Sequence, residues 1–437
     1  MSHYKPYPAY KDSGVEWLGE VPEHWAVIPC RAFVDDQTAK NDDGSKENYL
    51  SLMANIGIIP YEKKGDVGNK KPEDLTKCKL VSKGDFVINS MNYGIGSYGL
   101  SSLDGVCSPV YIVLRPRLDI VESRFAFRLF ENRSFQLYAQ SFGNGILEHR
   151  AAINWDILKG INVGIPAENE QRAILSFLDR ETAKIDTLIS KQEKLIELLK
   201  EKRQAVISHA VTKGLNPKAK MKDSGVGWLG EVPEHWESRK ISHAFERIGS
   251  GTTPPTGQDE WYLGSEIPWI TTGELRETVI TETSKYVTTK ALEEFSTLRL
   301  YPAGSLAMAM YGATIGRLGI LGVPATTNQA CCVLSGEINL SIHFAYFWFL
   351  AFKQQIIDLY AAGGGQPNIN QEVIANLRVP APTIADQTAI AAFLDRETSK
   401  IDTLISKSEK AIELQKEHRT ALISAAVTGK IDVRGAV

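Results

Sequence analysis

An internal repeat constrains the fold of this 437-residue sequence more than any other feature. Asp12 to Trp25 and Asp223 to Trp236 differ at one position, and so do Phe177 to Ser190 and Phe393 to Ser406. The second pair of blocks is offset by 216 residues (393 minus 177), and this offset continues without a gap over the neighbouring residues. The stretches between the matched blocks share little sequence. A common frame around divergent inserts predicts one scaffold that presents two different recognition surfaces.

Each copy of the repeat ends in a long predicted helix. The apolar residues recur in steps of three, four or seven, which is a 3.5-residue period, and neither segment contains glycine or proline before Gly214 or Gly429. About 44 residues at 1.5 Å each make a rod of roughly 65 Å. An apolar stripe of this length needs a partner, and the nearest candidate is its own duplicate. The expected stripes comprise Ile174, Leu178, Ile185, Leu188, Leu195, Leu199, Val206 and Ala210 in the first copy, and Ile390, Leu394, Ile401, Leu404, Ile412, Leu422 and Ala425 in the second.

The inserts are predicted to be mixed domains, with short apolar strands punctuated by glycine and followed by a helix. The fold class is therefore α+β: two mixed α/β domains alternate with two long helices that pair as an antiparallel coiled coil, related by a pseudo-two-fold internal duplication. In the first insert we expect strands at 85–89 and 110–114 and a helix at about 123–139; in the second, strands at 305–310 and 330–334 and a helix at about 342–360. The expected boundaries are 1–167 for the first domain, 168–213 for the first helix, 214–222 for a linker, 223–383 for the second domain and 384–430 for the second helix.

Charge and cysteine content narrow the possible roles. The net charge of -3 argues mildly against a free-standing nucleic-acid binder, because phosphate contacts need a basic surplus. The five cysteines form no C-x-x-C pair and show no metal-ligand spacing with histidine, so neither zinc nor disulfides are expected, and a reducing, cytoplasmic setting fits best. The start of the chain has no signal-peptide core, and the apolar run Phe344 to Phe352 is about half of a bilayer span, so we interpret it as a buried helix.

No catalytic motif is evident. Gly94 to Gly99 matches G-x-G-x-x-G, but a helix is not predicted after it, so glycine-bearing turns are the preferred interpretation over a dinucleotide site. The sequence has no Walker loop, no nucleophile elbow and no amino-methyltransferase motif. The His24-Trp25 and His235-Trp236 pairs belong to the repeated frame, where packing is the preferred explanation. We therefore expect no catalysis and no bound cofactor on this chain.

The second insert resembles the specificity (S) subunit of type I restriction-modification enzymes, and the resemblance covers nearly the whole chain, duplication included. The first insert departs from the pattern, since it lacks the TTP opening and the TNQ tripeptide. The flanking frame blocks still match there. The matching segments are Gly249 to Pro255 (GSGTTPP), Ile267 to Thr271 (IPWIT), Tyr311 to Gly319 (YGATIGRLG), Thr327 to Gln329 (TNQ), Gly365 to Asn370 (GQPNIN) and Val379 to Pro382 (VPAP).

The resemblance implies a role in phage defence with partners. Each of two target-recognition domains would read one half of a bipartite, asymmetric site in double-stranded DNA. Two methyltransferase (M) subunits would dock on the helices, and restriction/translocase (R) subunits would join them. Adenine methylation would use S-adenosylmethionine on the M subunits, with ATP and Mg also expected on partner subunits. The helix pair would act as a ruler for the spacer between half-sites.

Residues that contact bases are expected to be polar and to lie on insert loops. Arginine grips guanine, asparagine and glutamine pair with adenine edges, and tyrosine suits phosphate or stacking. The candidates in the second insert are Tyr311, Arg317, Asn328, Gln329, Gln366 and Asn368, and those in the first insert are Asn89, Asn92, Tyr93 and Arg150.

Two other classes of function remain open from the residues alone. A coiled-coil adaptor with two protein-binding domains would have no DNA affinity with any partner. A stand-alone methyltransferase would need a catalytic motif that the sequence lacks.

Overall fold

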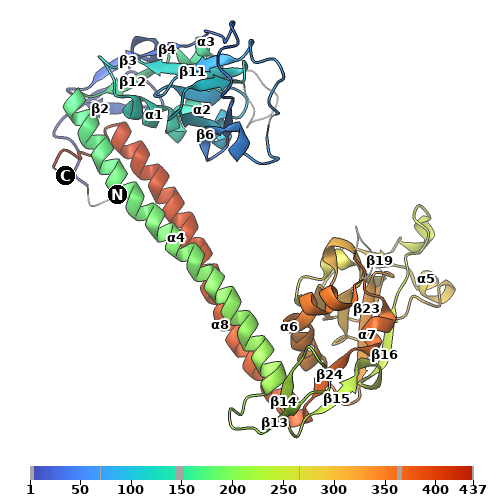
Figure 1. Cartoon of the computed structure of the whole chain (residues 1–437). Helices are drawn as coiled ribbons and strands as arrows, with labels where there is room; N and C mark the ends of the chain where they lie inside the picture. Colours follow the sequence, from blue (N-terminus) through green and yellow to red (C-terminus); the bar gives the residue numbers. More distant parts are fainter. Residues whose placement is uncertain (1–3, 69, 144–151, 265, 362–366, 436–437) are drawn as a thin grey trace. The chain divides into compact units, whose positions relative to one another are not determined.

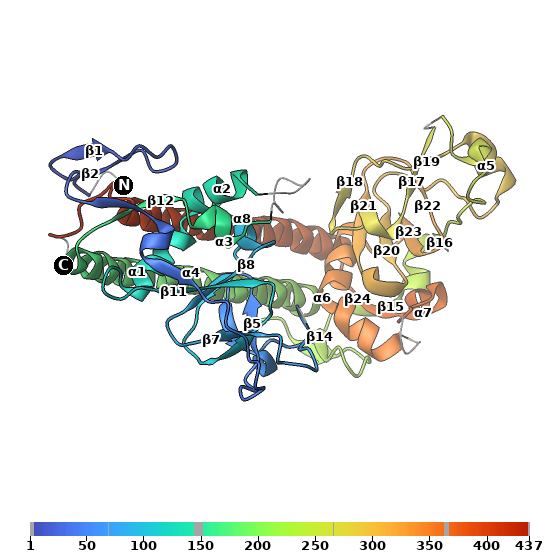
Figure 2. The same cartoon turned by 90° about the horizontal axis from the view of Figure 1, so that it is seen from above.

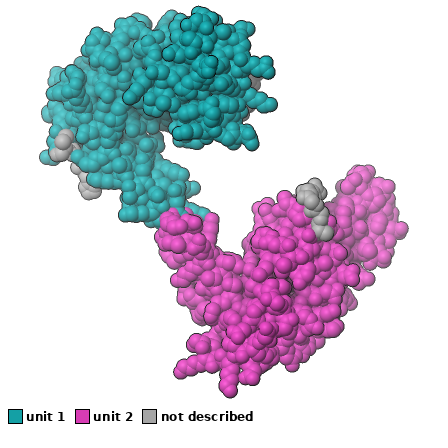
Figure 3. Space-filling view, viewed as in Figure 1, with its two compact units in different colours: residues 1–193, 409–437 teal, residues 194–408 magenta. Residues whose placement is uncertain are grey.

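The computed structural model describes residues 4–68, 70–143, 152–264, 266–361 and 367–435, and the chain forms two compact units. Unit 1 comprises residues 1–193 and 409–437, and unit 2 comprises residues 194–408 (Figure 3). Each unit contains one insert together with parts of both long helices. The C-terminal segment is therefore a structural part of the unit that holds the N-terminal domain.

The two long helices predicted from the sequence are present. Helix α4 spans Glu168–Lys213 and helix α8 spans Ile384–Val427, with 46 and 44 residues (Figure 1). Acidic residues lie in the first turn of each, where they interact favourably with the positive end of the helix dipole. Each helix ends within two residues of a glycine, as the stop signals predict.

Segments of the two helices pack together inside each unit. In unit 1, Phe177 and Leu178 of α4 share a buried core with Leu422 and Val427 of α8, and the segments lie side by side in both views (Figure 1, Figure 2). In unit 2, Ile207 and Val211 of α4 share a core with Ile390 and Leu394 of α8. Residues late in one helix therefore pack with residues early in the other, so the paired segments run in opposite directions.

Each unit also contains one copy of the same interhelical ion pair. The Nε of Arg419 lies 3.2 Å from Oδ1 of Asp186 in unit 1, and the Nε of Arg203 lies 2.8 Å from Oδ1 of Asp402 in unit 2. The 216-residue offset maps Asp186 onto Asp402 and Arg203 onto Arg419. The duplicated sequence therefore forms the same interhelical ion pair in each unit.

The prediction of the buried stripe was wrong at three positions. Leu188, Leu195 and Leu404 are 46%, 43% and 50% exposed. Their neighbours Ile189, Ile196 and Ile405 are half-buried instead, and with them the inward-facing positions alternate in steps of four and three. At each of these places two adjacent residues are apolar, and the sequence periodicity alone does not indicate which of the two faces inward. The inward-facing positions are Leu178, Thr182, Ile185, Ile189, Gln192, Ile196, Leu199 and Arg203 in α4, and Leu394, Thr398, Ile401, Ile405, Ser408, Ile412, Gln415 and Arg419 in α8.

Unit 1 is built on an antiparallel four-stranded sheet with the order β4-β11-β8-β9. Phe86 and Ile88 of its central strand β8 share a core with Phe125 and Leu129 of helix α1. The strands are β4 (Val34–Asp36), β11 (Tyr111–Pro116), β8 (Phe86–Asn89) and β9 (Tyr98–Leu100), and the helices are α1 (Ser123–Glu131), α2 (Arg133–Ser141) and α3 (Trp155–Leu158). The remaining strands pair as β1 (Tyr10–Asp12) with β2 (Glu20–Pro22), β3 (Ala26–Pro29) with β12 (Asn162–Ile165), β5 (Leu50–Met53) with β6 (Gly57–Pro60), and β7 (Lys79–Val81) with β10 (Gly105–Cys107).

The single helix expected at about 123–139 is divided in two at Asn132. The Asn132 side chain accepts hydrogen bonds from the backbone N–H groups of Ser134 and Phe135, at 2.8 and 3.3 Å. This is the arrangement of an N-cap, so asparagine ends α1 and starts α2.

Unit 2 is built on a five-stranded sheet with the order β16-β23-β20-β21-β18. Its core helix α6 (Ile342–Tyr360) contains the most apolar run of the chain, and Phe344, Trp348 and Phe349 in it are fully buried. No helix in the described part of the chain is long and apolar enough to cross a membrane. The strands of this sheet are β16 (Phe245–Ser250), β23 (Cys331–Glu337), β20 (Leu306–Ala309), β21 (Leu318–Leu321) and β18 (Thr278–Ile280). The remaining strands pair as β13 (Met221–Asp223) with β14 (Glu231–Pro233), β15 (Glu237–Lys240) with β24 (Arg378–Ala381), and β17 (Ile267–Ile270) with both β19 (Tyr286–Val287) and β22 (Thr326–Thr327). Two short helices complete the unit, α5 (Thr289–Glu294) and α7 (Gln371–Asn376).

The two inserts share one fold. Strands β4-β11-β8-β9 of unit 1 correspond in order to β16-β23-β20-β21 of unit 2, and β18 extends only the second sheet. The sequence prediction of one fold with two different surfaces agrees with this strand order.

A buried glutamine joins each insert to its long helix. The Gln171 side chain donates to the carbonyl groups of Ile120 and Pro166 and accepts from the N–H of Glu122. Gln387, 216 residues later, makes the same three bonds in unit 2, with Asn339, Pro382 and Ser341. The amide uses both its donors and its acceptor, so it fixes the start of the long helix relative to the insert.

The repeated histidine-tryptophan pairs have packing roles, as the sequence suggested. Trp25 is fully buried and donates from its indole N–H to Glu170 Oε1, at 3.0 Å, and His24 Nε2 lies 2.8 Å from Glu170 Oε2. The equivalent His235 lies 3.1 Å from Asp386. These contacts attach the frame block to the first turn of each long helix.

Candidate nucleic-acid interface

Motifs far apart in the second insert meet at one end of the sheet. The N–H of Gly251, just after β16, donates to Thr327 Oγ1 at 3.1 Å. A Cβ atom on Gly251 would lie only 1.6 Å from the carbonyl oxygen of Thr327, so only glycine permits this approach. Two residues farther on, the Thr253 hydroxyl donates to Gln329 Oε1 at 2.6 Å. The TTP opening and the TNQ tripeptide therefore form one surface.

Tyr311 and Asn368 lie together beside this surface. They form an isolated antiparallel bridge, and the N–H of Gly312 donates to the Pro367 carbonyl at 3.2 Å. Tyr311 is 41% exposed, and Asn368 is exposed as well. The structure thus brings together two predicted site residues that are 57 positions apart in the sequence (368 minus 311).

Arg317 ends the turn that Tyr311 begins. Its backbone N–H donates to the Thr314 carbonyl at 3.0 Å and its carbonyl accepts from Ala309, so the turn is held at both ends. The side chain is exposed, and among the described residues its guanidinium has no ion pair or hydrogen bond. An exposed cation on a fixed turn suits recognition of phosphate or guanine.

Asn328 and Gln329 differ in the exposure of their side chains and in the contacts that these make within the protein. Asn328 Oδ1 accepts from the N–H of Ala330 at 3.2 Å, which makes it a turn former, and its side chain is half-buried. Gln329 is exposed, and its contact with Thr253 positions its amide on the surface. The sequence pattern missed Thr253 because a hydroxyl is not distinctive by itself. Gln366 lies outside the described residues.

The corresponding turn in unit 1 follows β8 and carries Asn89 and Asn92. Asn89 Oδ1 accepts from the Met91 N–H at 3.1 Å. The Asn92 carbonyl accepts from Ile95 and Ser97, so the turn contains its own hydrogen bonds. Both asparagine side chains are half-buried; Asn89 is the last residue of β8, and Asn92 lies on the loop between β8 and β9. Arg150 lies outside the described residues.

The prediction that Tyr93 contacts DNA is wrong for this structure. Its side chain is fully buried in the main core of unit 1, and its hydroxyl donates to the Phe130 carbonyl. Burial raises the pKa of the phenol well above its usual value. A tyrosine next to glycine in a turn gives no sequence signal of such burial, because the turn folds back onto α1 only in the tertiary structure.

The glycines of residues 94–99 also have a structural role. Gly94 lies in the 3₁₀ turn η3 (Tyr93–Ile95), Gly96 caps this turn in a left-handed conformation, and Gly99 lies in strand β9, so a strand follows the turn where a helix would be needed. A dinucleotide site needs a helix N-terminus at that point. The preference for glycine-bearing turns over a cofactor site agrees with this geometry.

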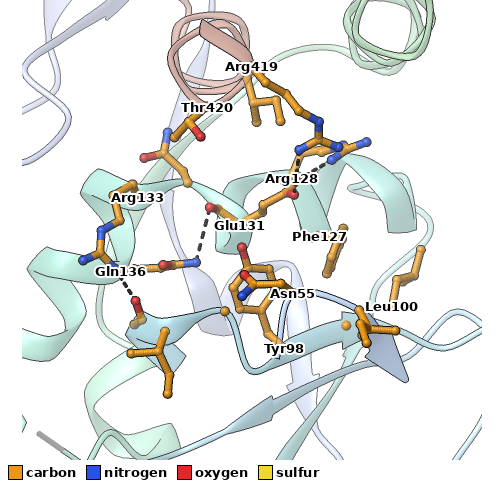
Figure 4. Close-up of a pocket in the computed structure, with 18 of the residues that line it drawn as sticks. Asn55, Tyr98, Leu100, Phe127, Arg128, Glu131, Arg133, Gln136, Arg419 and Thr420 are labelled. Carbon is orange, nitrogen blue, oxygen red and sulfur yellow. Dashed lines mark hydrogen bonds and ion pairs between the residues drawn. The ribbon is translucent and has the colours of Figure 1, made fainter. Parts of the chain in front are cut away.

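A cavity of about 820 Å³ lies beside this turn, between α1, α2 and α8 (Figure 4). Glu131 forms an ion pair with Arg128, and Arg419 Nη1 lies 3.9 Å from Glu131 Oε1. Arg133 Nη1 donates to the Gly94 carbonyl at 2.5 Å. The cavity therefore has a polar wall in which two arginines lie near one carboxylate.

Within the part of the chain that the structure describes, the residue types that commonly bind metal ions are dispersed. No cluster of three or more His, Cys, Asp or Glu residues there is arranged to hold a metal ion. The five cysteines are free and buried, and burial raises the pKa of Cys107, Cys331 and Cys332 to about 12. Such thiols stay protonated near pH 7 and are poor nucleophiles.

Comparisons with known proteins agree with this geometry. A family profile described as type I restriction modification DNA specificity domain matches residues 40–198 and 233–414. The type I restriction enzyme MjaVIII specificity subunit of Methanocaldococcus jannaschii is 24% identical over 429 residues, which is 95% of this chain and 94% of the relative. The HindI specificity subunit of Haemophilus influenzae is 21% identical, and its alignment covers 84% of this chain and 90% of the relative.

Solved structures share the fold. A chain from work on complex assembly and conformational transition of the type I R-M system aligns with a TM-score of 0.74 at 13% identity, covering 94% of this chain and 99% of the other. The HsdS subunit from Thermoanaerobacter tengcongensis aligns with a TM-score of 0.55 at 14% identity, covering 94% and 98%. Since the profile matches both inserts and most of both long helices, the chain belongs to the family of type I restriction-modification DNA specificity proteins.

Proposed function

We propose that this chain is the sequence-specific DNA-recognition subunit of a type I restriction-modification complex, and that each unit reads one half of a bipartite, asymmetric site. The observation that carries this proposal is that the two units share one strand order but have chemically different turns after β8 and after β20. We call these two turns the reading turns. At equivalent positions the turn in unit 1 has exposed Met91 and buried Ser97, whereas the turn in unit 2 has exposed Tyr311 and Arg317. Two unlike surfaces on a duplicated scaffold fit a site whose halves differ.

The long helices, in this proposal, pair as an antiparallel coiled coil, set the spacer between half-sites and dock two methyltransferase subunits. The alternating steps of the inward-facing positions and the duplicated Arg–Asp ion pairs support the coiled coil. Exposed leucines recur in both copies, as Leu188 with Leu404 and Leu198 with Leu414. Two equivalent apolar surfaces support docking of two identical partners.

The chemistry belongs to the partners. S-adenosylmethionine would bind to the methyltransferase subunits, while ATP and Mg would serve the restriction/translocase subunits, in the cytoplasm. The protonated buried thiols and the absence of a catalytic motif in the sequence support a non-catalytic chain. A coiled-coil adaptor without DNA specificity is less favoured, because exposed polar side chains gather on turns of an insert that the DNA specificity profile matches.

The direct test is to express the chain with its proposed methyltransferase partner and to map methylated adenines across the host genome. A single bipartite motif that disappears when this chain is deleted is expected. Methylation that does not depend on the chain, or is unchanged without it, would contradict the proposal.

Replacing Arg317 with alanine is expected to weaken binding to the cognate site about 5- to 160-fold, because a guanidinium that grips a base contributes roughly 1–3 kcal/mol. The specificity for that base pair should relax, while the half-site read by unit 1 stays unchanged. Binding of the reconstituted complex to a set of single-base variants measures both effects. Arg378→Ala is the matched control, since Arg378 is exposed in β24 of the frame. Equal losses for the two variants would argue against a reading role for Arg317.

The purified chain alone is expected to bind DNA weakly, with a dissociation constant no tighter than the non-specific range of about 10⁻⁶ to 10⁻⁴ M at physiological salt. Its net charge of -3 leaves few counterions to release. Addition of the methyltransferase subunit should add both affinity and sequence preference. Titration of labelled duplexes at several salt concentrations gives the comparison, and tight, specific binding by the chain alone would contradict the expectation.

A further inference from the structure

Two turns of unit 1 are held against each other at the reading end of the insert. One joins β5 to β6, and the other contains η3. The N–H of Asn55 in the first turn donates to the Gly96 carbonyl in the second, at 2.9 Å. Gly96 has a φ of 87°, and a Cβ atom there would lie 2.2 Å from Asn55 Oδ1. Glycine is therefore required at position 96, where the hydrogen bond joins the two turns.

This surface exposes three large aliphatic side chains, Ile56, Met91 and Ile95, which we call the apolar tip. Ile56 is 67% exposed, Met91 58% and Ile95 51%. A single exposed aliphatic residue needs no explanation, but these three lie on two turns that a hydrogen bond joins, and Ile56 and Ile95 line the same cavity. Sequence reasoning missed them because it sought only polar readers.

A cation lies at the edge of the apolar tip. Arg133 Nη1 donates to the carbonyl of Gly94, one residue before Ile95, at 2.5 Å. Among the described residues Arg133 forms no ion pair, so its charge is held by a neutral carbonyl and is not cancelled. Aliphatic groups beside an uncompensated guanidinium match the charge pattern of a DNA groove, where base methyl groups lie between phosphates.

The equivalent turn in unit 2 is chemically different. Strands β8 and β20, and likewise β9 and β21, are offset by 220 residues (306 minus 86), which places Tyr311 at the position of Met91 and Arg317 at that of Ser97. The turn in unit 1 thus has an exposed thioether side chain where unit 2 has a phenol, and a buried serine where unit 2 has an exposed guanidinium. The two units are equipped to read different base edges.

We propose that the apolar tip reads thymine, by contact with the C5-methyl group in the major groove of the half-site bound by unit 1, while Arg133 contacts a neighbouring phosphate. This inference rests on the proposed function. The thymine methyl is the one apolar group among the base edges of the major groove, and apolar side chains recognise it. The phosphate contact fixes the register of the tip on the duplex.

The test uses the full chain in complex with its methyltransferase and a duplex of the mapped motif. Each thymine of the unit 1 half-site is replaced in turn by uracil, which keeps every hydrogen-bonding group and removes only the methyl. Binding is expected to weaken about 3- to 5-fold at one or two positions, the effect of burying one methyl group. In Ile56→Ala and Ile95→Ala the thymine duplex should bind more weakly, and the difference between thymine and uracil should shrink toward one.

Ile338→Ala is the matched control, because Ile338 is a 57% exposed isoleucine that follows the far end of β23 in unit 2. It should retain the full difference between thymine and uracil. Thermal unfolding of each variant verifies that the fold is intact, and Ile56→Val, which keeps a branched side chain, should preserve most of the difference.

Several results would overturn the inference while leaving the proposed function intact. These are a unit 1 half-site without thymine, wild-type binding that is insensitive to uracil at every position, or alanine variants that keep the difference. Loss of methyltransferase association in the same variants, with DNA discrimination unchanged, would assign the apolar tip to a protein partner and also overturn it. Failure of the proposed function itself would be recognised separately, by wild-type complexes that methylate no bipartite motif.

Discussion

A fragment spanning Met1 to Lys222 is expected to pair with a second copy of itself and, with the methyltransferase, to modify an interrupted palindrome. The palindrome would consist of the unit 1 half-site and its inverted repeat. The asymmetric site of the full chain should no longer be methylated, a change of on the order of 100-fold or more, because the half-site read by unit 2 is lost. Methylation mapping in cells that express the fragment with the partner subunit measures the outcome.

The physical reason lies in the core of unit 1. The end of α8 contributes Leu422, Ile423, Ala426 and Val427 to this core, and the fragment lacks them. Its own α4 carries similar residues at the equivalent positions, 216 residues earlier: Val206, Ile207, Ala210 and Val211. Leaving the core face of unit 1 uncovered costs roughly 25 cal/mol per Å² of apolar surface, so a second fragment should supply the missing helix end with two-fold symmetry.

One position in this replacement does not match. Ala425 is 5% exposed in the core of unit 1, whereas its equivalent in α4 is His209, which is exposed in unit 2. In the fragment dimer an imidazole would occupy the place of a buried methyl group. His209→Ala should therefore stabilise the dimer by about 1–3 kcal/mol, since a buried polar ring without partners is unfavourable. Sedimentation at several concentrations compares the two fragments. A fragment that stays monomeric with either residue would show that the two halves are not interchangeable.

Adding four residues to both helices, within Lys191 to Lys202 and within Lys407 to His418, is expected to lengthen the spacer by one to two base pairs. Both half-sites should stay unchanged. One helical turn is about 5.4 Å, and a base pair rises about 3.4 Å. On the original spacing, binding should fall by about 100-fold or more, because one half-site would be out of reach. Duplexes with a graded series of spacers give the measurement.

The alternating steps of the inward-facing positions supply the control. A four-residue insertion equals one step of the pattern, so when made in both helices it keeps the apolar face continuous, with a local unwinding. The same insertion after Gln192 alone displaces the later positions of α4 against an unchanged α8 and should destabilise the pair without defining a new spacer. Altered half-site bases at an unchanged spacing in the double insertion would contradict the ruler.

The sequence by itself determined the large-scale plan of this protein. The near-identical frame blocks predicted two copies of one domain, and the strand orders of the two units agree. The uninterrupted 3.5-residue pattern predicted α4 and α8, and the run from Phe344 to Phe352 predicted the buried helix α6. These features can be predicted because the patterns behind them are local or repeated. Periodicity, the positions of glycine and proline, and internal sequence identity can be recognised without knowing which surface each segment packs against.

Only the tertiary structure decided which of several equivalent side chains face inward. Ile189 rather than Leu188 faces the partner helix, Tyr93 enters the core of unit 1 rather than the reading surface, and Ile56 reaches the reading turn from a hairpin more than 30 residues away (93 minus 56). Each outcome depends on contacts between residues distant in the chain. The free energies of these contacts cannot be inferred from a local sequence pattern. The C-terminal end of α8 belongs to unit 1 for the same reason: its apolar face is buried only when the beginning of α4 lies beside it.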